Sequence, residues 1–244
     1  MVSPAGARIR GYFAESRAHR YSLLFALPLL LLYELLEAVA PIRSGGGVVR
    51  NGADVLLTSA FVALLGPWGP TCFMAIVIGV ALVLAWRDRK GGIRPMTFAI
   101  MLLESAALAL AFGAVVGTAT VHLLGPLHAL SAGAVAASPL ASLTLSLGAG
   151  LYEELLFRVV LVALLSNGLR LAGLGRMGAG VIATFIGALV FSAFHYVGPM
   201  GDPFRLESFV FRAIAGVAFS ALYLTRGFGI TAWTHALYDV AVMM

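Results

Sequence analysis

The sequence predicts an all-α, polytopic transmembrane helix bundle that forms a single membrane-embedded domain over residues 1–244. Of the 244 residues, 61% are hydrophobic and only 11% are charged, whereas about a quarter of the residues of a soluble domain are charged. The mean hydropathy is +0.98, and apolar stretches of the length that crosses a bilayer recur along the chain. These observations exclude a soluble globular protein.

The apolar stretches are separated by short polar or glycine-rich loops. An arginine-rich segment, residues 1–20, precedes the first span, and Pro28 is expected to kink that span. The stretch 54–66 is short and ends at Gly-Pro-Trp-Gly-Pro, so we expect a short helix that does not cross the membrane. If it does cross, there are eight spans. Otherwise there are about seven, near residues 21–40, 71–86, 96–117, 139–165, 178–197, 208–225 and 229–244.

The distribution of charge predicts the orientation. Ala38-Val39-Ala40 resembles a signal-peptide cleavage site, but Pro41 directly after it argues for a retained first helix. With seven spans, the loop 118–138, which lacks Lys and Arg, lies opposite to the basic segments. The positive-inside rule then makes residues 1–20 a cytoplasmic tail. A composition rich in Ala, Gly and Arg suggests a bacterial cytoplasmic membrane.

The net charge of +5 is spread over loops in contact with membrane lipids, and no basic cluster is dense enough to bind nucleic acid. The single cysteine, Cys72, excludes an intrachain disulfide and a multi-cysteine metal site. The oligomeric state is not encoded in any motif that we recognise.

Three charges lie within the predicted span 139–165. Glu153, Glu154 and Arg158 stand in a run that is otherwise apolar. Ionisable groups at bilayer depth cost free energy unless they are paired or hydrated, so they are functional candidates by default. On a helix, Glu154 and Arg158 share a face and can form an ion pair. Glu153 points about 100° away from Glu154 and is free to act as a base.

Two later spans also carry ionisable groups. His195 ends one span and follows Phe191 by four residues, and His235 and Asp239 lie four residues apart in the last span. A lone histidine in a membrane helix is most often a structural, hydrogen-bonded residue, and a His/Asp pair is equally consistent with an interhelical contact. The combination of Glu, His and His/Asp on three spans is more informative, because it suffices to activate a water molecule or to bind a metal.

The three motifs together resemble those of the CPBP family of intramembrane proteases, the CAAX-protease and bacteriocin-processing group. The family pattern E-E-x-x-x-R, F-x-x-x-H and H-x-x-x-N corresponds to Glu153-Glu154 with Arg158, Phe191 with His195, and His235 with Asp239. The resemblance covers residues 139–244, which we therefore expect to contain the catalytic core helices. A departure that bears on the chemistry is Asp239, which stands where well-characterised members have Asn.

The resemblance implies an intramembrane glutamic endopeptidase that cleaves a membrane-associated peptide or protein. Glu153 and His195 would activate the water, His235 and Asp239 would face the oxyanion, and Arg158 would hold Glu154 ionised. An ionised Asp239 would repel the oxyanion, so we expect Asp239 to be protonated or to accept the ring N–H of His235.

The sequence leaves alternatives open for the use of a metal in catalysis and for the class of function. We favour catalysis without a cofactor, because H-E-x-x-H is absent from the sequence; the less favoured alternative is Zn²⁺ bound by Glu153, His195 and His235. A proton-coupled transporter would use the same carboxylates and histidines as a relay. A non-catalytic scaffold or bacteriocin-immunity protein is the remaining alternative, although such copies usually lose one of these residues.

Overall fold

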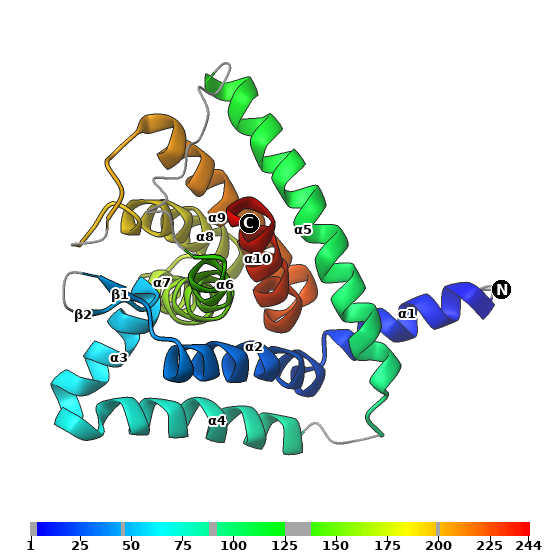
Figure 1. Cartoon of the computed structure of the whole chain (residues 1–244). Helices are drawn as coiled ribbons and strands as arrows, with labels where there is room; N and C mark the ends of the chain where they lie inside the picture. The colour runs from blue at the N-terminus through cyan, green and yellow to red at the C-terminus, as the bar shows by residue number, and fades with distance from the viewer. Residues whose placement is uncertain (1–3, 45–46, 88–91, 125–137, 199–200) are drawn as a thin grey trace.

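The computed structural model describes residues 4–44, 47–87, 92–124, 138–198 and 201–244, without the side chains of residues 4–9 and 44. Helices make up nearly all of it (Figure 1), as predicted. Residues Arg43–Ser44 (β1) and Gly47–Val48 (β2) pair as a two-residue antiparallel hairpin inside the predicted glycine-rich loop. The helices are α1 (Pro4–Ser16), α2 (His19–Val39), α3 (Gly52–Leu65), η1 (Gly66–Trp68), α4 (Gly69–Arg87), α5 (Pro95–Leu124), α6 (Pro139–Gly148), η2 (Ala149–Leu161), α7 (Val162–Leu171), α8 (Arg176–Phe194), α9 (Leu206–Arg226) and α10 (Phe228–Met243).

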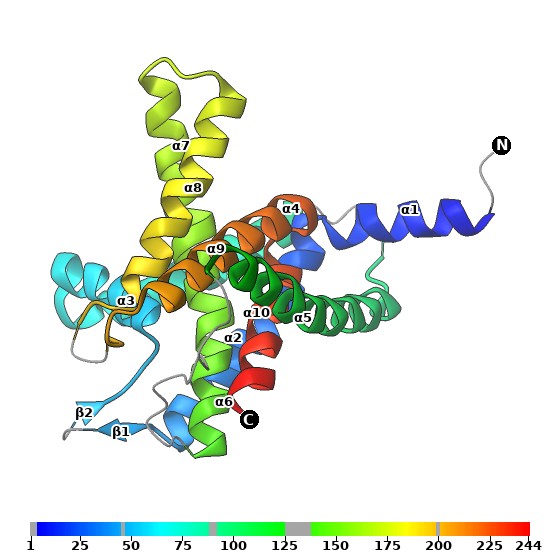
Figure 2. The same cartoon turned by 90° about the horizontal axis from the view of Figure 1, so that it is seen from above.

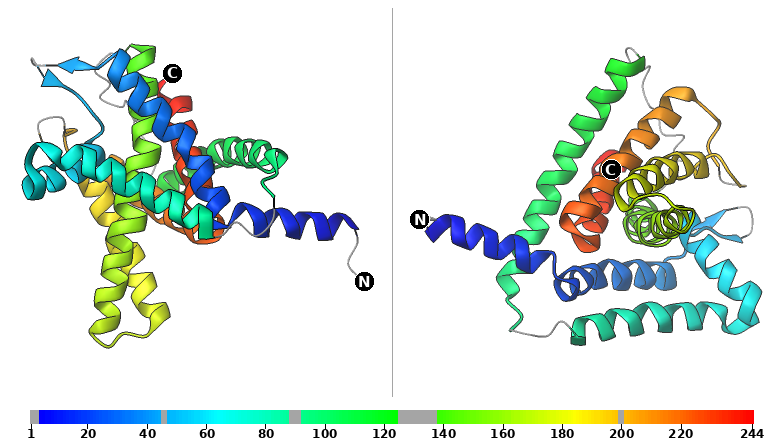
Figure 3. Two further views of the ribbon diagram at one scale, coloured as in Figure 1. Left: turned by 90° about the horizontal axis from the view of Figure 1, so that it is seen from below. Right: turned by 180° about the vertical axis from the view of Figure 1, so that it is seen from behind.

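Helix α10 lies at the centre of the bundle. It packs against α2, α5, α6, η2 and α9 (Figure 1). The segments α6, η2 and α7 form one long rod, and α8 returns beside α7 so that this hairpin projects beyond the other helices (Figures 2 and 3). Helix α1 projects sideways from the bundle. The rod, α8 and α10 thus bring together the three spans that carry the motif residues.

Five stretches in the described part of the chain are long and apolar enough to cross a membrane: His19–Val39, Gly52–Arg87, Pro95–Leu124, Arg176–Phe194 and Leu206–Arg226. The stretch Gly52–Arg87 contains a turn at η1, which separates α3 from α4. The predicted span 139–165 is divided among α6, η2 and α7, of 10, 13 and 10 residues, and α10 has 16 residues. The count of about seven spans therefore stays a prediction.

Several predicted boundaries were wrong. Helix α5 continues to Leu124, well past residue 117. Pro28 lies inside α2, which agrees with the predicted span, and the expected kink stays a prediction. Helix α8 ends at Phe194, so His195 is its C-cap residue. Residues 125–137 of the predicted loop 118–138, and 88–91 of the loop after α4, lie outside the described residues.

Two glycines at the junction of α6 and η2 allow neighbouring helices to come close. A Cβ on Gly150 would lie 2.4 Å from the carbonyl oxygen of Ala232 and 2.7 Å from the Cβ of Ala236, both on α10. A Cβ on Gly148 would lie 2.5 Å from the ring of Tyr33 on α2. Small residues at helix contacts are the usual means of close packing in membranes. They bring η2 directly against α10, where His235 lies.

Candidate active site

The glutamates lie in a π-helical segment, η2, where the sequence had predicted an ordinary α-helix. A π-helix forms i→i+5 hydrogen bonds and is widened relative to an α-helix, and such segments are frequent at functional sites. The spacing of apolar residues in the sequence does not distinguish a π-helix from an α-helix, so this widening could not be predicted. Glu153, Glu154 and Arg158 are all buried within it.

The predicted ion pair between Glu154 and Arg158 is present. Glu154 Oε1 lies 3.1 Å from Arg158 Nη1, and the two side chains are 0% and 2% exposed. Arg158 Nη2 also donates to the carbonyl oxygen of Gly216 at 3.4 Å, and its guanidinium lies over the Phe191 ring, 4.5 Å from the centroid. Because this arginine is so fully enclosed, it fixes the position of Glu154.

Glu154 in turn holds His235. The Nδ1 atom of His235 is 2.7 Å from Glu154 Oε1, and the imidazole stacks on Phe219 with 4.3 Å between the ring centroids. Asp239 Oδ2 is 3.6 Å from His235 Nε2, which is beyond hydrogen-bond distance. Glu154, rather than Asp239, is therefore the acceptor that orients this ring, because it occupies the Nδ1 side.

His195 is oriented by its own helix. Its Nδ1 lies 2.9 Å from the carbonyl oxygen of Phe191, one turn earlier in α8. A carbonyl can only accept, so Nδ1 carries the proton, and in the neutral ring Nε2 bears the lone pair. That Nε2 atom faces Glu153 Oε2 at 3.9 Å.

Glu153 has one oxygen held and one oxygen open. Oε1 accepts a hydrogen bond of 2.9 Å from Asn51 Nδ2, whereas Oε2 is buried and has no hydrogen-bond partner within the described ranges. Oε2 lies 3.9 Å from His195 Nε2 and 4.0 Å from His235 Nε2. One water molecule, at about 2.8 Å from each of two polar atoms, bridges separations of this size.

Asn51 is a site residue that the sequence interpretation missed. Its Oδ1 caps helix α3 by accepting from the backbone N–H of Ala53 at 2.9 Å and of Asp54 at 3.4 Å. An asparagine before a helix is recognisable as an N-cap. No sequence pattern indicates, however, that its amide reaches a glutamate 102 positions away.

The six predicted site residues thus gather in one cluster, in which His195 and Asp239 are half-buried and the others are buried: Glu153, Glu154 and Arg158 from η2, His195 from the end of α8, and His235 and Asp239 from α10. Other ionisable residues of the spans lie elsewhere. Glu34 pairs with Arg50, and Glu104 pairs with Arg226 at 2.6 Å. Among the residues that the structure describes, the carboxylates and imidazoles of this cluster all come from the three motifs, and Asn51 joins them.

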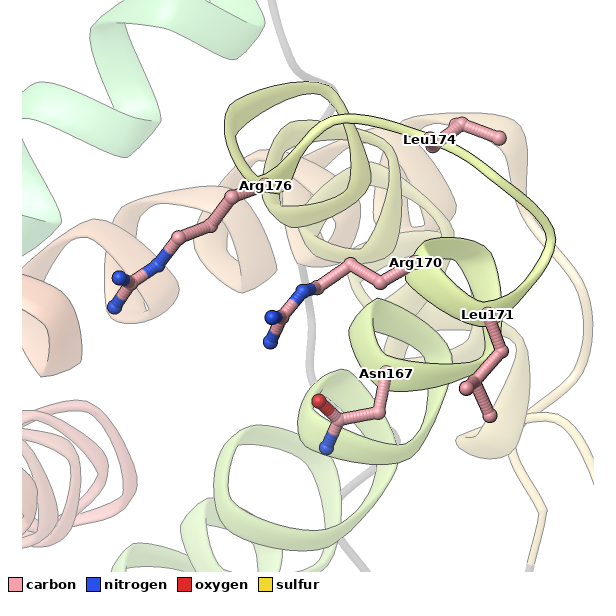
Figure 4. Close-up of a pocket in the computed structure, with 5 residues that line it drawn as sticks. All are labelled: Asn167, Arg170, Leu171, Leu174 and Arg176. Atoms are coloured by element: carbon pink, nitrogen blue, oxygen red, sulfur yellow. The ribbon is translucent and has the colours of Figure 1, made fainter.

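A separate surface hollow lies at the turn between α7 and α8. Arg170, Arg176 and Asn167 point to one side of it, and Leu171 and Leu174 complete its lining (Figure 4). Its lining contains none of the six clustered residues. It lies at the projecting end of the α7–α8 hairpin.

The three residues suggested as zinc ligands, Glu153, His195 and His235, are not arranged as a metal site. Among the described residues, no group of three or more His, Cys, Asp and Glu side chains is arranged to hold a metal ion. The separations of 3.9 and 4.0 Å between Glu153 Oε2 and the two histidine nitrogens exceed the spacing of tetrahedral zinc ligands, about 3.3 Å. Zinc binding by Glu153, His195 and His235 would require these side chains to move closer.

The part of the chain that carries this cluster matches a known protein family. Residues 135–241 match the family described as type II CAAX prenyl endopeptidase Rce1-like. Over these residues, which are fewer than half of the chain, the sequence is similar to this family. The match spans η2, α8 and α10 and hence all six clustered residues. No curated protein and no solved structure matched the chain.

The family match and the five apolar stretches together indicate an integral membrane protein. The matched family is described as a CAAX prenyl endopeptidase, so the reaction class that the match indicates is peptide hydrolysis.

Proposed function

We propose that this protein is an intramembrane endopeptidase in which Glu153 and His195 activate a water molecule. The observation that carries the proposal is the open oxygen of Glu153. It is buried, unpaired within the described structure, and faces the Nε2 atoms of two histidines at 3.9 and 4.0 Å. A carboxylate held in this way is suited to hydrogen-bond a water molecule together with an imidazole.

The proposed reaction begins at that water. Its oxygen bonds to the carbonyl carbon of the scissile peptide, and its proton passes to Glu153 Oε2. His195 Nε2 accepts the second hydrogen bond of the water and so fixes its orientation. The carbonyl electron pair moves to the oxygen, which becomes an oxyanion. The oxyanion electron pair then re-forms the carbonyl, the C–N bond breaks with its electrons moving to nitrogen, and Glu153 returns the proton to that leaving amine nitrogen.

His235 is proposed to stabilise the oxyanion. Its Nδ1–H is committed to Glu154, so Nε2 can donate only when the ring is an imidazolium. Oxygens of Glu154, Asp239 and Glu153 lie 2.7, 3.6 and 4.0 Å from the ring nitrogens and compensate that positive charge. Asp239 contributes no amide donor, so in its ionised form it opposes the oxyanion.

The ion pair of Glu154 and Arg158 is proposed to act through His235. Arg158 balances the charge of Glu154, and Glu154 fixes the imidazole. Neither side chain needs to touch the substrate. Both are therefore positioning residues in this scheme.

The test is Glu153→Gln in protein reconstituted into liposomes. Two substrates are compared, a prenylated peptide ending in a CAAX sequence and an unprenylated single-span peptide, and products are identified by mass spectrometry. We expect Glu153→Gln to reduce cleavage by about 10²–10⁴-fold. Its thermal unfolding should match that of the unsubstituted protein, because the amide preserves the shape of the side chain and an oxygen acceptor for Asn51.

An active, folded Glu153→Gln would overturn the assignment. Proton flux across the same liposomes, followed with an internal pH dye, distinguishes the transporter hypothesis. Flux that depends on Glu153, without cleavage of either peptide, would favour a proton relay over a peptidase.

A further inference from the structure

One face of α9 lines the catalytic cluster. Phe219 stacks on His235, and one turn earlier the carbonyl oxygen of Gly216 accepts from Arg158. Near the start of the helix, the carbonyl oxygen of Phe209 accepts from Ser192 Oγ on α8 at 2.6 Å. Arg212 lies on this same face, between Phe209 and Gly216. It belongs to none of the motifs by which the site was predicted.

Arg212 is tied to the segment that carries His195. Its Nη2 donates to Asp202 Oδ2 at 2.5 Å, and the backbone N–H of Asp202 donates to the carbonyl oxygen of His195 at 2.9 Å. The guanidinium lies over the ring of Tyr196, 5.3 Å from its centroid. Its charge acts electrostatically on both His195 and Asp239. Arg212 is therefore a cation at the edge of the cluster.

Two donors at this edge have no acceptor. Arg212 Nη1 and Tyr196 Oη are buried, and neither has a hydrogen-bond partner among the residues that the structure describes. Buried polar groups in folded proteins are nearly always hydrogen-bonded, so each such group calls for an explanation. A substrate oxygen brought to the cluster would supply the missing acceptor.

The charges of the cluster indicate which substrate oxygen this is. Glu153, Glu154 and Asp239 are carboxylates. The charge of Arg158 is balanced by Glu154 at 3.1 Å and its Nη2 donates to Gly216, although its Nη1 has no hydrogen-bond partner among the described residues. Asp239 stands where an amide donor is expected. His235 is then the one oxyanion donor supplied by the motif residues. The negative charge that develops on the oxyanion therefore needs a second hydrogen-bond donor, and a cationic one would stabilise it most.

We propose that Arg212 is a catalytic residue that donates from Nη1 to the oxyanion of the tetrahedral intermediate, assisted by Tyr196 Oη. The proposal rests on the proposed peptidase function. Arg212 stays protonated throughout: the carbonyl electron pair moves to the oxygen as the water oxygen bonds to the carbon, and the guanidinium hydrogen-bonds to that charge. In this role Arg212 compensates for the carboxylate at position 239.

The experiment compares Arg212→Gln with Asp202→Asn in the liposome assay. Both substitutions remove the ion pair that holds the 201–205 segment, but only the first removes the cationic donor. We expect Arg212→Gln to lower kcat by about 10²–10³-fold with KM nearly unchanged, the size observed when one oxyanion donor is removed. Asp202→Asn should change kcat less than about fivefold. Arg212→Lys keeps the charge but loses the planar fork, so it should fall between the two and serves if Arg212→Gln does not fold.

A rescue measurement separates chemistry from structure. Adding Asp239→Asn to Arg212→Gln supplies an amide donor and should recover at least about tenfold in kcat.

Equal losses of kcat in Arg212→Gln and Asp202→Asn would overturn the proposal, because they would mean that Arg212 acts only by holding the 201–205 segment in place. A rise in KM with kcat unchanged would overturn it in favour of ground-state substrate binding. Glu153→Gln in the same assay keeps the hypotheses apart: if it cleaves normally, the peptidase assignment itself has failed.

Discussion

Two charge networks lie next to each other in this protein and differ in how completely they are paired. The first surrounds Arg50, which bonds Glu34 at 3.0 Å and Asp54 at 2.5 Å. Tyr33 and Thr58 donate to the two oxygens of Asp54, at 2.8 and 3.0 Å, and Tyr152 donates to Glu34 at 2.6 Å. Arg50 Nη2 also donates to the second oxygen of Glu34 at 3.1 Å, so every carboxylate oxygen of Glu34 and Asp54 is hydrogen-bonded.

The second network, around Glu153, is left open. Glu153 Oε2 and Glu154 Oε2 are buried without a hydrogen-bond partner in the part of the chain that the structure describes. The networks adjoin twice along the chain, at Arg50-Asn51 and at Tyr152-Glu153. We infer from this difference that the closed network has a structural role, a frame for the site. In the open network, substrate and water supply the missing hydrogen-bond partners.

The largest effect on stability is expected at Arg158. Replacing it with Ala leaves Glu154, which is 0% exposed, as an uncompensated buried charge. Breaking a buried ion pair in this way costs about 3–5 kcal/mol. We therefore expect Arg158→Ala to unfold at a much lower temperature in detergent and to give a low yield of folded protein.

The matched control removes both charges. Glu154→Gln combined with Arg158→Met should recover most of the lost stability, because replacing a whole buried pair by neutral groups is often close to neutral. It should not recover activity, because the neutral amide that replaces the Glu154 carboxylate would orient the His235 imidazole without stabilising its positive charge. A double variant as unstable as Arg158→Ala would show that packing of the guanidinium on Phe191, and not charge, dominates.

Asn51 connects the two networks, and its substitution separates their roles. Asn51→Ser keeps an N-cap acceptor for α3, so stability should fall by less than about 1 kcal/mol. The bond from Nδ2 to Glu153 is lost, so the carboxylate is free to rotate, and kcat should fall about tenfold, or about 1.4 kcal/mol in activation free energy. Unfolding and steady-state kinetics on the same preparation measure the two quantities.

Asn51→Asp tests the sign of this effect. It keeps the cap but sets a second carboxylate against Glu153 Oε1, which is 2.9 Å from the present amide nitrogen. It should therefore impair kcat more than Asn51→Ser does. If both variants cleave as well as the unsubstituted protein, the orientation of Glu153 does not depend on Asn51.

The sequence predicted what depends on local pattern and charge. Apolar length and low charge predicted the helical membrane bundle, and the spacing of Glu154 and Arg158 predicted their ion pair. The gathering of the three motifs around Glu153 followed from resemblance, not from spacing alone. Two long-range contacts were not predicted: His235 Nδ1 lies against Glu154 from another helix, and Asn51 reaches Glu153 across 102 positions. The π-helical widening of η2 and the unpaired donor of Arg212 likewise depend on packing that no periodicity reveals.

The smallest effect is expected in the closed network, at Glu34. Its side chain is 32% exposed and that of Arg50 is 33% exposed, and ion pairs so open to their surroundings contribute at most about 1 kcal/mol. Glu34→Gln keeps an oxygen that accepts from Tyr152, so the residue next to Glu153 stays in place. We expect a decrease in stability below about 1 kcal/mol and cleavage within about twofold of normal, measured by thermal unfolding and by the liposome assay. A large loss of cleavage with normal stability would mean that the closed network takes part in the chemistry, and the contrast between frame and site would no longer hold.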